Sequence, residues 1–265
     1  MDTWSNKHTH KFQATPKRYP RVSVVIPVLN EQENLPYVLP KIPKWVHEVI
    51  LVDGHSQDRT VNVARELLPT IRVLEQMGRG KGDALRCGFQ VARGDIIIML
   101  DADGSTNPAE MAEFVQALTR GADFVKGSRF ARGGGTADME GYRRLGNFGF
   151  VLLVRVLFGG HYSDLCYGYN AFWRYVLPNL ELDCNGFEIE TKLNVQVLRK
   201  GFNIVEVPSF EAARVHGVSH LKTFPDGWRV LKTILREARA EWAERLTRRA
   251  WRAHPPMLTL SNRSL

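Results

Sequence analysis

The sequence has few cysteines, no repeats and no low-complexity block in its 265 residues. The three cysteines, Cys87, Cys166 and Cys184, are odd in number and widely spaced. This pattern excludes a disulfide framework and a zinc site built from closely spaced cysteines. We therefore expect a protein of a reducing compartment, the cytoplasm.

Long hydrophobic runs are also missing. Residues 1–20 are polar and have none of the apolar core of a signal peptide, so we expect a flexible N-terminal arm. No run reaches the ~18 apolar residues of a membrane-spanning helix. The nearest run, residues 148–160, is shorter and contains Arg155, which leaves open a core helix or a helix in a membrane interface.

Acidic residues are the minority charge, with 28 Asp and Glu against 36 Lys and Arg, and the pI is about 9.5. Anionic partners are plausible: nucleotides, nucleic acid or an anionic membrane surface. A basic balance without such a partner is the alternative. We expect no nucleic acid, because the chain lacks a recognition motif with interleaved aromatic residues.

What the chain does have is a regular alternation of strand-like and helix-like segments. The expected strands are residues 21–28, 47–54, 71–76, 95–100, 122–129 and 202–210. The expected helices are residues 30–42 (or a turn), 56–68, 80–93, 107–121, a segment carrying 148–158, 185–201 and 228–252. This order predicts an α/β domain over residues 21–227, with a mostly parallel sheet flanked by helices, followed by a basic amphipathic helix and tail over 228–265.

Polar residues follow four of the predicted strands. They are Asn30, Glu31, Asp53, Asp101, Asp103 and Arg129. Because the carboxyl ends of parallel strands share one edge and ligands bind there, we expect one site.

Asp101 and Asp103 end the apolar strand "DIIIML" one residue apart. Period two along a strand would point both carboxylates the same way, where they repel unless a cation joins them. Mg²⁺ or Mn²⁺ with substrate phosphates suits such a pair. A solvated "DADG" turn is the alternative.

Further candidates each have a structural alternative. Asp53 suits a nucleobase or ribose but could cap the next helix, and Lys81 suits a phosphate at a helix N-terminus. Arg129, Arg143, Arg144 and Arg214 suit phosphate but could be surface residues. Glu188 and Glu190 would supply a general base to a hydroxyl acceptor or be structural helix residues.

Six segments in order carry a family resemblance: "VSVVIPVLNEQENL", "VILVDGHSQDRT", "GRGKGDALRCGF", "IIIMLDADGSTNP", "VKGSRF" and "RVHGVSHLK". Over residues 21–235 the chain resembles family 2 inverting glycosyltransferases with the GT-A (Rossmann-like) fold, most closely the dolichol-phosphate mannose synthase, or polyprenyl-phosphate glycosyltransferase, branch. The resemblance implies transfer of a sugar from a UDP- or GDP-sugar to polyprenyl phosphate. A saccharide or small-molecule hydroxyl acceptor is the alternative.

The resemblance also implies roles. Pro27, Asn30, Glu31 and Asp53 would hold the nucleoside, with Lys81 beside the donor phosphates, and Asp101, Asp103 and Ser105 the divalent metal and the diphosphate. Arg129, with Arg143 or Arg144, would hold the acceptor phosphate. A mobile loop with Arg214, His216, Ser219, His220 and Lys222 would close over the donor, so that Asp103, Arg129 and Arg214 are the catalytic candidates.

Two positions depart from the family pattern. His220 stands where the loop often has a lysine and Lys222 follows two residues later, which leaves open which of them screens the diphosphate. "DADG" replaces the more usual "DADL" of mannose synthases, which leaves the sugar and the nucleotide open.

The segment 228–252 carries eight Lys and Arg against three Glu, with an apolar set of Trp228, Leu231, Ile234, Leu235, Trp242 and Leu246. Such a helix is typical of binding to anionic lipid, and packing on its own domain or a partner is the alternative. We expect a cytoplasmic protein that associates peripherally with the membrane, through this surface or a small membrane protein.

Overall fold

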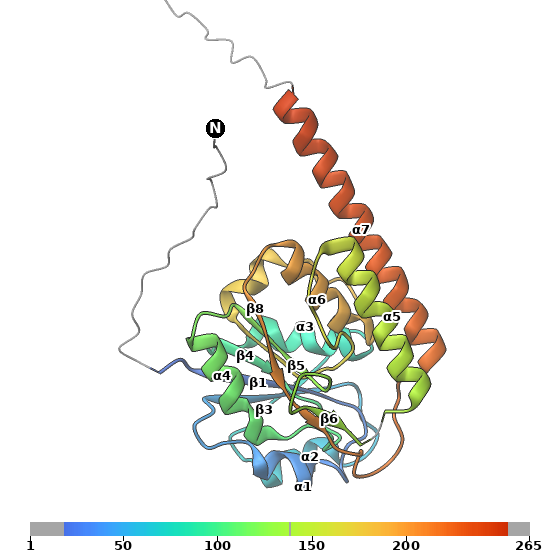
Figure 1. Cartoon of the computed structure of the whole chain (residues 1–265). Helices are drawn as coiled ribbons and strands as arrows, with labels where there is room; N and C mark the ends of the chain where they lie inside the picture. Colours follow the sequence, from blue (N-terminus) through green and yellow to red (C-terminus); the bar gives the residue numbers. More distant parts are fainter. Residues whose placement is uncertain (1–18, 138, 254–265) are drawn as a thin grey trace, which may run out of the picture.

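The structure, a computed structural model, describes residues 19–137 and 139–253, and its centre is a seven-stranded sheet of order β3-β2-β1-β4-β7-β5-β8 (Figure 1). The strands are β1 (Val22–Val28), β2 (Glu48–Asp53), β3 (Arg72–Glu75), β4 (Ile96–Met99), β5 (Phe124–Ser128), β7 (Asn170–Trp173) and β8 (Ile204–Pro208). A separate pair joins β6 (Gly135–Thr136) to β9 (Phe210–Glu211). The prediction of a mostly parallel α/β sheet is confirmed.

One strand runs against the others. β7 pairs antiparallel with both β4 and β5, while the other neighbouring pairs in this sheet are parallel. β7 was not among the predicted strands. The strand has only four residues and lies in the stretch between the predicted helices, where no regular pattern indicates it.

Helices cover both faces of the sheet (Figure 1). They are α1 (Leu35–Val38), α2 (Thr60–Leu67), α3 (Lys81–Val91), α4 (Met111–Thr119), α5 (Gly141–Phe158), α6 (Glu188–Arg199) and α7 (Thr223–Ala253). Along β1, Val24 and Ile26 face the core shared with α1, α2 and α4, whereas Val25 faces the core shared with α3 and α6. The two-residue period of a strand thus builds two cores from one segment.

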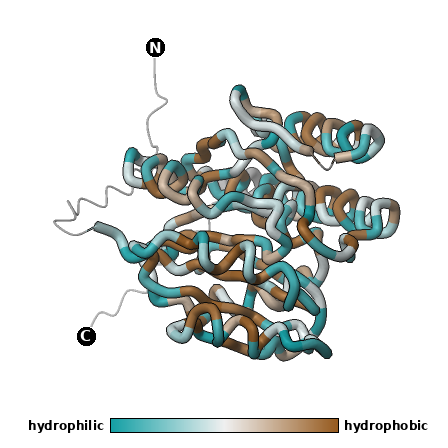
Figure 2. Tube along the Cα trace, turned by 90° about the horizontal axis from the view of Figure 1, so that it is seen from below, coloured by the Kyte–Doolittle hydropathy of each residue, from teal (hydrophilic) through white to brown (hydrophobic). Residues whose placement is uncertain are grey.

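A third, smaller core joins α5, α6 and α7 through Val154, Val195, Val230 and Ile234. Figure 2 shows that hydrophobic and hydrophilic residues alternate along the helical turns of the molecule. Among the described residues, no helix is long and apolar enough to cross a membrane.

Helix starts differ from the expectations. α2 begins at Thr60 rather than near residue 56, because residues 54–59 form a turn whose Asp58 accepts the Thr60 N–H at 2.9 Å. α5 begins at Gly141, ahead of the expected helical segment 148–158.

α7 begins at Thr223, so the suggested boundary between residues 227 and 228 falls inside a helix. Its first half packs on the domain, where Glu237 accepts from Arg199 and lies 2.9 Å from Lys192. The helix then extends beyond the body of the domain (Figure 1). Residues 1–18 of the expected arm and 254–265 of the expected tail lie outside the described residues.

Close packing of α3 on the sheet depends on Gly88. A Cβ at Gly88 would lie 2.3 Å from a methyl carbon of Val25 and 3.1 Å from one of Val52. We expect Gly88→Ala to lower the free energy of unfolding by about 1–3 kcal/mol through overpacking, measured by urea denaturation. Gly149→Ala in α5 is the control, since its Cβ would meet nothing within 4 Å. The control should be neutral or stabilising by up to about 1 kcal/mol, and equal losses in both variants would contradict the packing argument.

Candidate active site

The polar groups expected at the strand ends do meet at one edge of the sheet. β1, β2 and β4 are parallel, and β5 shares their direction because both β4 and β5 run antiparallel to β7. Glu31, after β1, and Asp103, after β4, are joined through the guanidinium of Arg214. We call this edge the rim.

Arg214 is the first of two cations that organise the rim. Its Nη2 donates to Glu31 Oε1 at 2.5 Å, and its Nη1 lies 3.4 Å from Asp103 Oδ2. Its Nε donates to the His216 carbonyl at 2.7 Å. A residue more than a hundred positions from either carboxylate thus pairs its single positive charge with both of them.

The segment carrying Arg214 is fixed by backbone contacts as well. The Ala212 and Val215 N–H groups donate to the carbonyls of Ser105 and Asp103, at 2.8 and 3.2 Å. The His216 N–H donates to Asn34 Oδ1 at 2.8 Å. The later loop residues Ser219, His220 and Lys222 are exposed, and the mobility of the loop remains a prediction.

Lys81 is the second cation. Its Nζ lies 2.6 Å from Asp101 Oδ1 and 2.5 Å from Glu190 Oε1, although the sequence had suggested a phosphate contact. Burial alone would lower the pKa of Lys81, but the charges of Asp101 and Glu190 raise it well above its usual value. Burial raises the pKa of Glu190, against the opposing effect of Lys81. Lys81 therefore stays charged at neutral pH.

Two glycines permit this arrangement. A Cβ at Gly168 would lie 2.7–3.0 Å from Glu190 Oε1, Asp101 Oδ2 and Lys81 Nζ, so only glycine leaves room for the three charged groups. Gly104 has a φ of 80°, and a Cβ there would come within 2.7 Å of Val215. The glycine of "DADG" is thus a requirement of the turn and of the segment that covers it.

The residues expected to hold a metal are two carboxylates and a hydroxyl. Ser105 donates to Asp103 Oδ1 from its hydroxyl at 2.7 Å and from its N–H at 3.0 Å. Within the described residues, no three His, Cys, Asp or Glu side chains converge to hold a metal by themselves. Mg²⁺ usually takes one or two protein carboxylates plus phosphates and waters. Asp101 and Asp103 fit this pattern, and each already forms an ion pair with a cationic side chain.

Asp53 and Asn30 lie at the rim, where β2 and β1 end. Asp53 is buried and accepts the Ser56 N–H at 3.2 and 3.3 Å, so it does not cap α2, the alternative role that the sequence left open. Asn30 has a φ of 56°, and its side chain accepts the Gln57 N–H at 2.8 Å. Pro27 lies within β1, opposite Val52 of β2.

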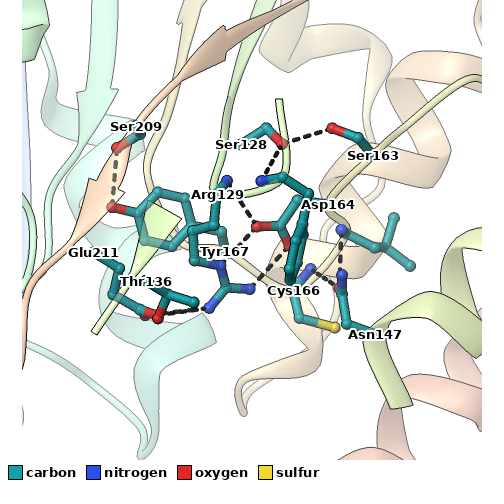
Figure 3. A network of polar contacts seen from close by, with 12 residues as sticks. Ser128, Arg129, Thr136, Asn147, Ser163, Asp164, Cys166, Tyr167, Ser209 and Glu211 are labelled. Atoms are coloured by element: carbon teal, nitrogen blue, oxygen red, sulfur yellow. Dashed lines mark hydrogen bonds and ion pairs between the residues drawn. The ribbon is translucent and has the colours of Figure 1, made fainter. Parts of the chain in front are cut away.

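Arg129 is buried in a polar network (Figure 3). Its Nε and Nη2 donate to the two oxygens of Asp164 at 2.6 and 2.9 Å, and its Nη1 lies 3.1 Å from Glu211. The guanidinium also lies 4.8 Å from the ring centre of Tyr167. Burial would lower the pKa of Arg129, but Asp164 and Glu211 raise it, so its charge is already compensated within the protein.

A cavity of about 430 Å³ lies between α5, the start of α6 and the start of α7. Its polar wall includes Arg129, Arg143 and Glu190. Its apolar wall includes Tyr142, Phe150, Phe224, Trp228 and Leu231. Glu190 connects the cavity to the rim, because the same carboxylate binds Lys81 and Lys81 binds Asp101.

The two candidate arginines of α5 differ. Arg143 lines the cavity and forms no ion pair within the described part of the chain. Arg144 is exposed, and its guanidinium lies 5.7 Å from the ring centre of Phe130. Glu188, the other candidate base, accepts the Gly186 N–H at 3.2 Å next to its own helix start.

Sequence reasoning missed Asp164, Glu211, Tyr167 and Asn34 as neighbours of the site. Asp164 does not end a predicted strand, and it lies 35 residues from Arg129. The only signal was the aromatic "HYSDLCYGYN" stretch, whose Tyr162, Tyr167 and Tyr169 are buried.

Comparison with known proteins places the chain in a family. Residues 23–180, more than half of the chain, match the model of glycosyl transferase family 2. The chain belongs to glycosyl transferase family 2, which confirms the resemblance and, at the level of the family, the expected glycosyltransferase class.

Three relatives are each 32% identical to this chain. One is the dolichol-phosphate mannosyltransferase of Pyrococcus furiosus, over 213 residues that cover 76% of this chain and 59% of that protein. Another is the polyprenol monophosphomannose synthase of Mycolicibacterium smegmatis, over 221 residues that cover 78% and 83%. This chain thus spans less than two thirds of the Pyrococcus protein.

A solved structure shares the fold. Glucosyl-3-phosphoglycerate synthase of Mycobacterium tuberculosis, in complex with Mn²⁺, UDP and phosphoglyceric acid, superposes with a TM-score of 0.68 at 23% identity. The match covers 83% of this chain and 78% of that one.

The Arg129–Asp164 pair predicts a pH-dependent stability. Burial would raise the pKa of Asp164, but Arg129 and Lys126 hold it below its usual value. Asp164 therefore stabilises the fold above about pH 4, the usual pKa of an aspartate, and the effect is lost as pH falls through the lowered value. Asp164→Asn should cost about 3–5 kcal/mol in urea unfolding at neutral pH, because Arg129 stays buried.

Glu66→Gln is the control for Asp164→Asn. Glu66 pairs with Arg59 at 2.9 Å on the surface, where both side chains are exposed, so its loss should cost at most about 1 kcal/mol. Equal costs for the two variants would contradict the buried role of Asp164.

Proposed function

We propose that the protein transfers a sugar from a UDP- or GDP-sugar to polyprenyl phosphate with inversion, using Mg²⁺ or Mn²⁺. The observation that carries the proposal is the cavity, which offers Arg143 beside apolar aromatic walls and adjoins the rim through Glu190. An acceptor with an anionic head and an apolar tail matches both parts of this lining. The names of two of the 32% identical relatives support the same acceptor class.

The donor would lie along the rim. Asn30, Glu31 and Asp53 would face its nucleoside, and Asp101, Asp103 and Ser105 would hold the metal next to its diphosphate. When bound, the metal ion supplies positive charge that stabilises the leaving diphosphate. The metal-containing structures of the distant Mycobacterium tuberculosis relative are consistent with this role.

Lys81 and Arg214 would then exchange partners. Each is paired with a rim carboxylate, at 2.6 and 3.4 Å. Lys81 and Arg214 would release Asp101 and Asp103 to the metal ion and would pair with oxygens of the diphosphate instead. Arg214 is held by the segment 212–216, so its movement would carry the loop with Ser219, His220 and Lys222 toward the donor.

The acceptor needs orientation rather than a base. A phosphate monoester is largely dianionic at neutral pH, with a second pKa of about 6. Arg143 would bind it directly, and Arg129, whose charge is balanced by Asp164 and Glu211, would position that side of the cavity. In-line attack on the anomeric carbon then gives inversion, with the approach set by these contacts.

A hydroxyl acceptor is the second candidate, because Glu190 lines the cavity and has a raised pKa. A base is required for a hydroxyl but not for a phosphate. The proposal favours the phosphate, since Lys81 occupies the Glu190 carboxylate at 2.5 Å.

A radiolabel transfer assay tests the proposal. Purified protein is mixed with Mg²⁺, polyprenyl phosphate and labelled GDP-mannose or UDP-glucose, and we expect label in the organic phase with one donor. EDTA should abolish it. Asp103→Asn should lower turnover at least about 100-fold, because the carboxylate charge is lost while an oxygen remains to cap Ser105.

The outcomes separate the alternatives. Metal-dependent donor hydrolysis without a lipid product would shift the acceptor to a hydroxyl compound and make Glu190 the next residue to replace. Turnover that is unchanged in Asp103→Asn would contradict the metal assignment.

Arg143 and Arg144 make a matched pair. Arg143→Gln should raise the KM for polyprenyl phosphate about tenfold or more, the effect of losing a hydrogen bond to a charged group, with little change in the KM for the donor. Arg144→Gln, which removes the same charge one residue away, should change both values less than about threefold. The reverse ranking would contradict the assignment of the cavity as the acceptor site.

A further inference from the structure

The outward side of α5 carries large apolar residues in a row. Leu145, Phe148, Leu152 and Val156 are 71%, 64%, 51% and 74% exposed. Spacings of three and four residues place them on one side of the helix. We call these four residues the α5 outer face.

This face is not the core-packing side of α5. Asn147 and Val154 on the opposite side are buried, and Val154 belongs to the core shared with α6 and α7. A helix that is apolar on both sides is typical of a buried helix. The domain covers only the side of α5 that carries Asn147 and Val154. The α5 outer face therefore has the composition of a surface that binds a partner.

The face continues into the mouth of the cavity. α5 and α7 run side by side (Figure 1), and the rings of Tyr142 and Phe224 stack at 6.5 Å. Both rings line the cavity and are themselves exposed, by 53% and 84%. Trp228, also on the cavity wall, is 57% exposed.

Charge indicates what covers this surface. α5 contains Arg143, Arg144 and Arg155 and no acidic residue. The neighbouring turns of α7 add the exposed Lys232, whereas the exposed Arg229 and Arg236 are paired with Asp226 and Asp183 at 2.8 and 3.0 Å. An apolar row flanked by cations complements the headgroups and outer acyl region of an anionic bilayer. A second copy of the same surface would bring like charges together.

We infer that the α5 outer face, with Tyr142, Phe224 and Trp228, docks on an anionic lipid bilayer and inserts its apolar side chains at the headgroup level. The cavity mouth then faces the membrane. The proposed function adds a use for this orientation: the cavity mouth admits the lipid tail while the phosphate reaches Arg143. This use rests on the proposed function. The docking itself rests on exposure and charge alone.

Vesicle flotation tests the docking. The full chain is mixed with phosphatidylcholine vesicles, with or without phosphatidylglycerol, and the fraction that floats with the vesicles is measured. We expect binding that requires phosphatidylglycerol. Leu145→Glu and Leu152→Glu should each weaken it at least about tenfold, the value of one buried leucine side chain. Arg155→Gln should weaken it about fivefold.

Trp45→Glu is the matched control. Trp45 is 50% exposed in the connection before β2, outside α5 and α7, so its replacement adds the same charge at another exposed apolar position. This variant should float like the wild type. Equal loss in Trp45→Glu and Leu152→Glu would overturn the inference, and so would wild-type protein that stays unbound to phosphatidylglycerol vesicles. A wild-type dimer that Leu152→Glu dissociates, without flotation, would assign the face to a second copy instead.

The readout separates this inference from the proposed function. Flotation requires no turnover, so wild-type protein that floats but transfers no sugar would leave the docking surface standing and remove the proposed reaction. If both hold, Leu152→Glu should keep its activity on a short-chain, water-soluble polyprenyl phosphate and lose activity on acceptor embedded in vesicles.

Discussion

Two partly buried cations hold the carboxylates of the rim together. Lys81 joins Asp101 to Glu190, and Arg214 joins Glu31 to Asp103. Without them, negative groups crowded at neighbouring strand ends would repel one another in a region of reduced dielectric. The same pairs tie α3, α6 and the segment after β9 to the sheet, so the geometry of the site and the packing around it depend on one set of charges.

The molecule divides its chemistry between two surfaces that meet at Glu190. The rim beside β1, β2 and β4 is polar and suits a nucleotide and a metal ion, whereas the cavity between α5 and α7 is largely apolar and ends in arginine. Gly168 is the point of closest approach, because a side chain there would collide with the charged groups that join the two surfaces. In the proposed function, donor and acceptor therefore approach from different sides.

The predictions were correct where a local sequence pattern and the observed element have the same physical cause. Continuous apolar runs predicted β1, β2 and β4, since a strand covered on both faces needs apolar residues throughout. They failed at β7, whose place between β4 and β5 is set by pairing with strands far away in the chain. The start of α2 was misplaced because Asp58 accepts from both the N–H and the hydroxyl of Thr60 just before the helix.

Local sequence pattern was enough to predict β1, β2 and β4, the polar residues that follow them and the carboxylate pair Asp101 and Asp103, because apolar runs and the two-residue strand period are local properties. Only the tertiary structure decided that Lys81 pairs with Glu190 109 residues away and Arg214 with Glu31 183 residues away. It also decided that Arg143 rather than Arg144 lines the cavity, and which side of α5 is exposed. Ion pairing and helix rotation depend on neighbours that no local pattern specifies, and they are fixed only when the separate cores pack together.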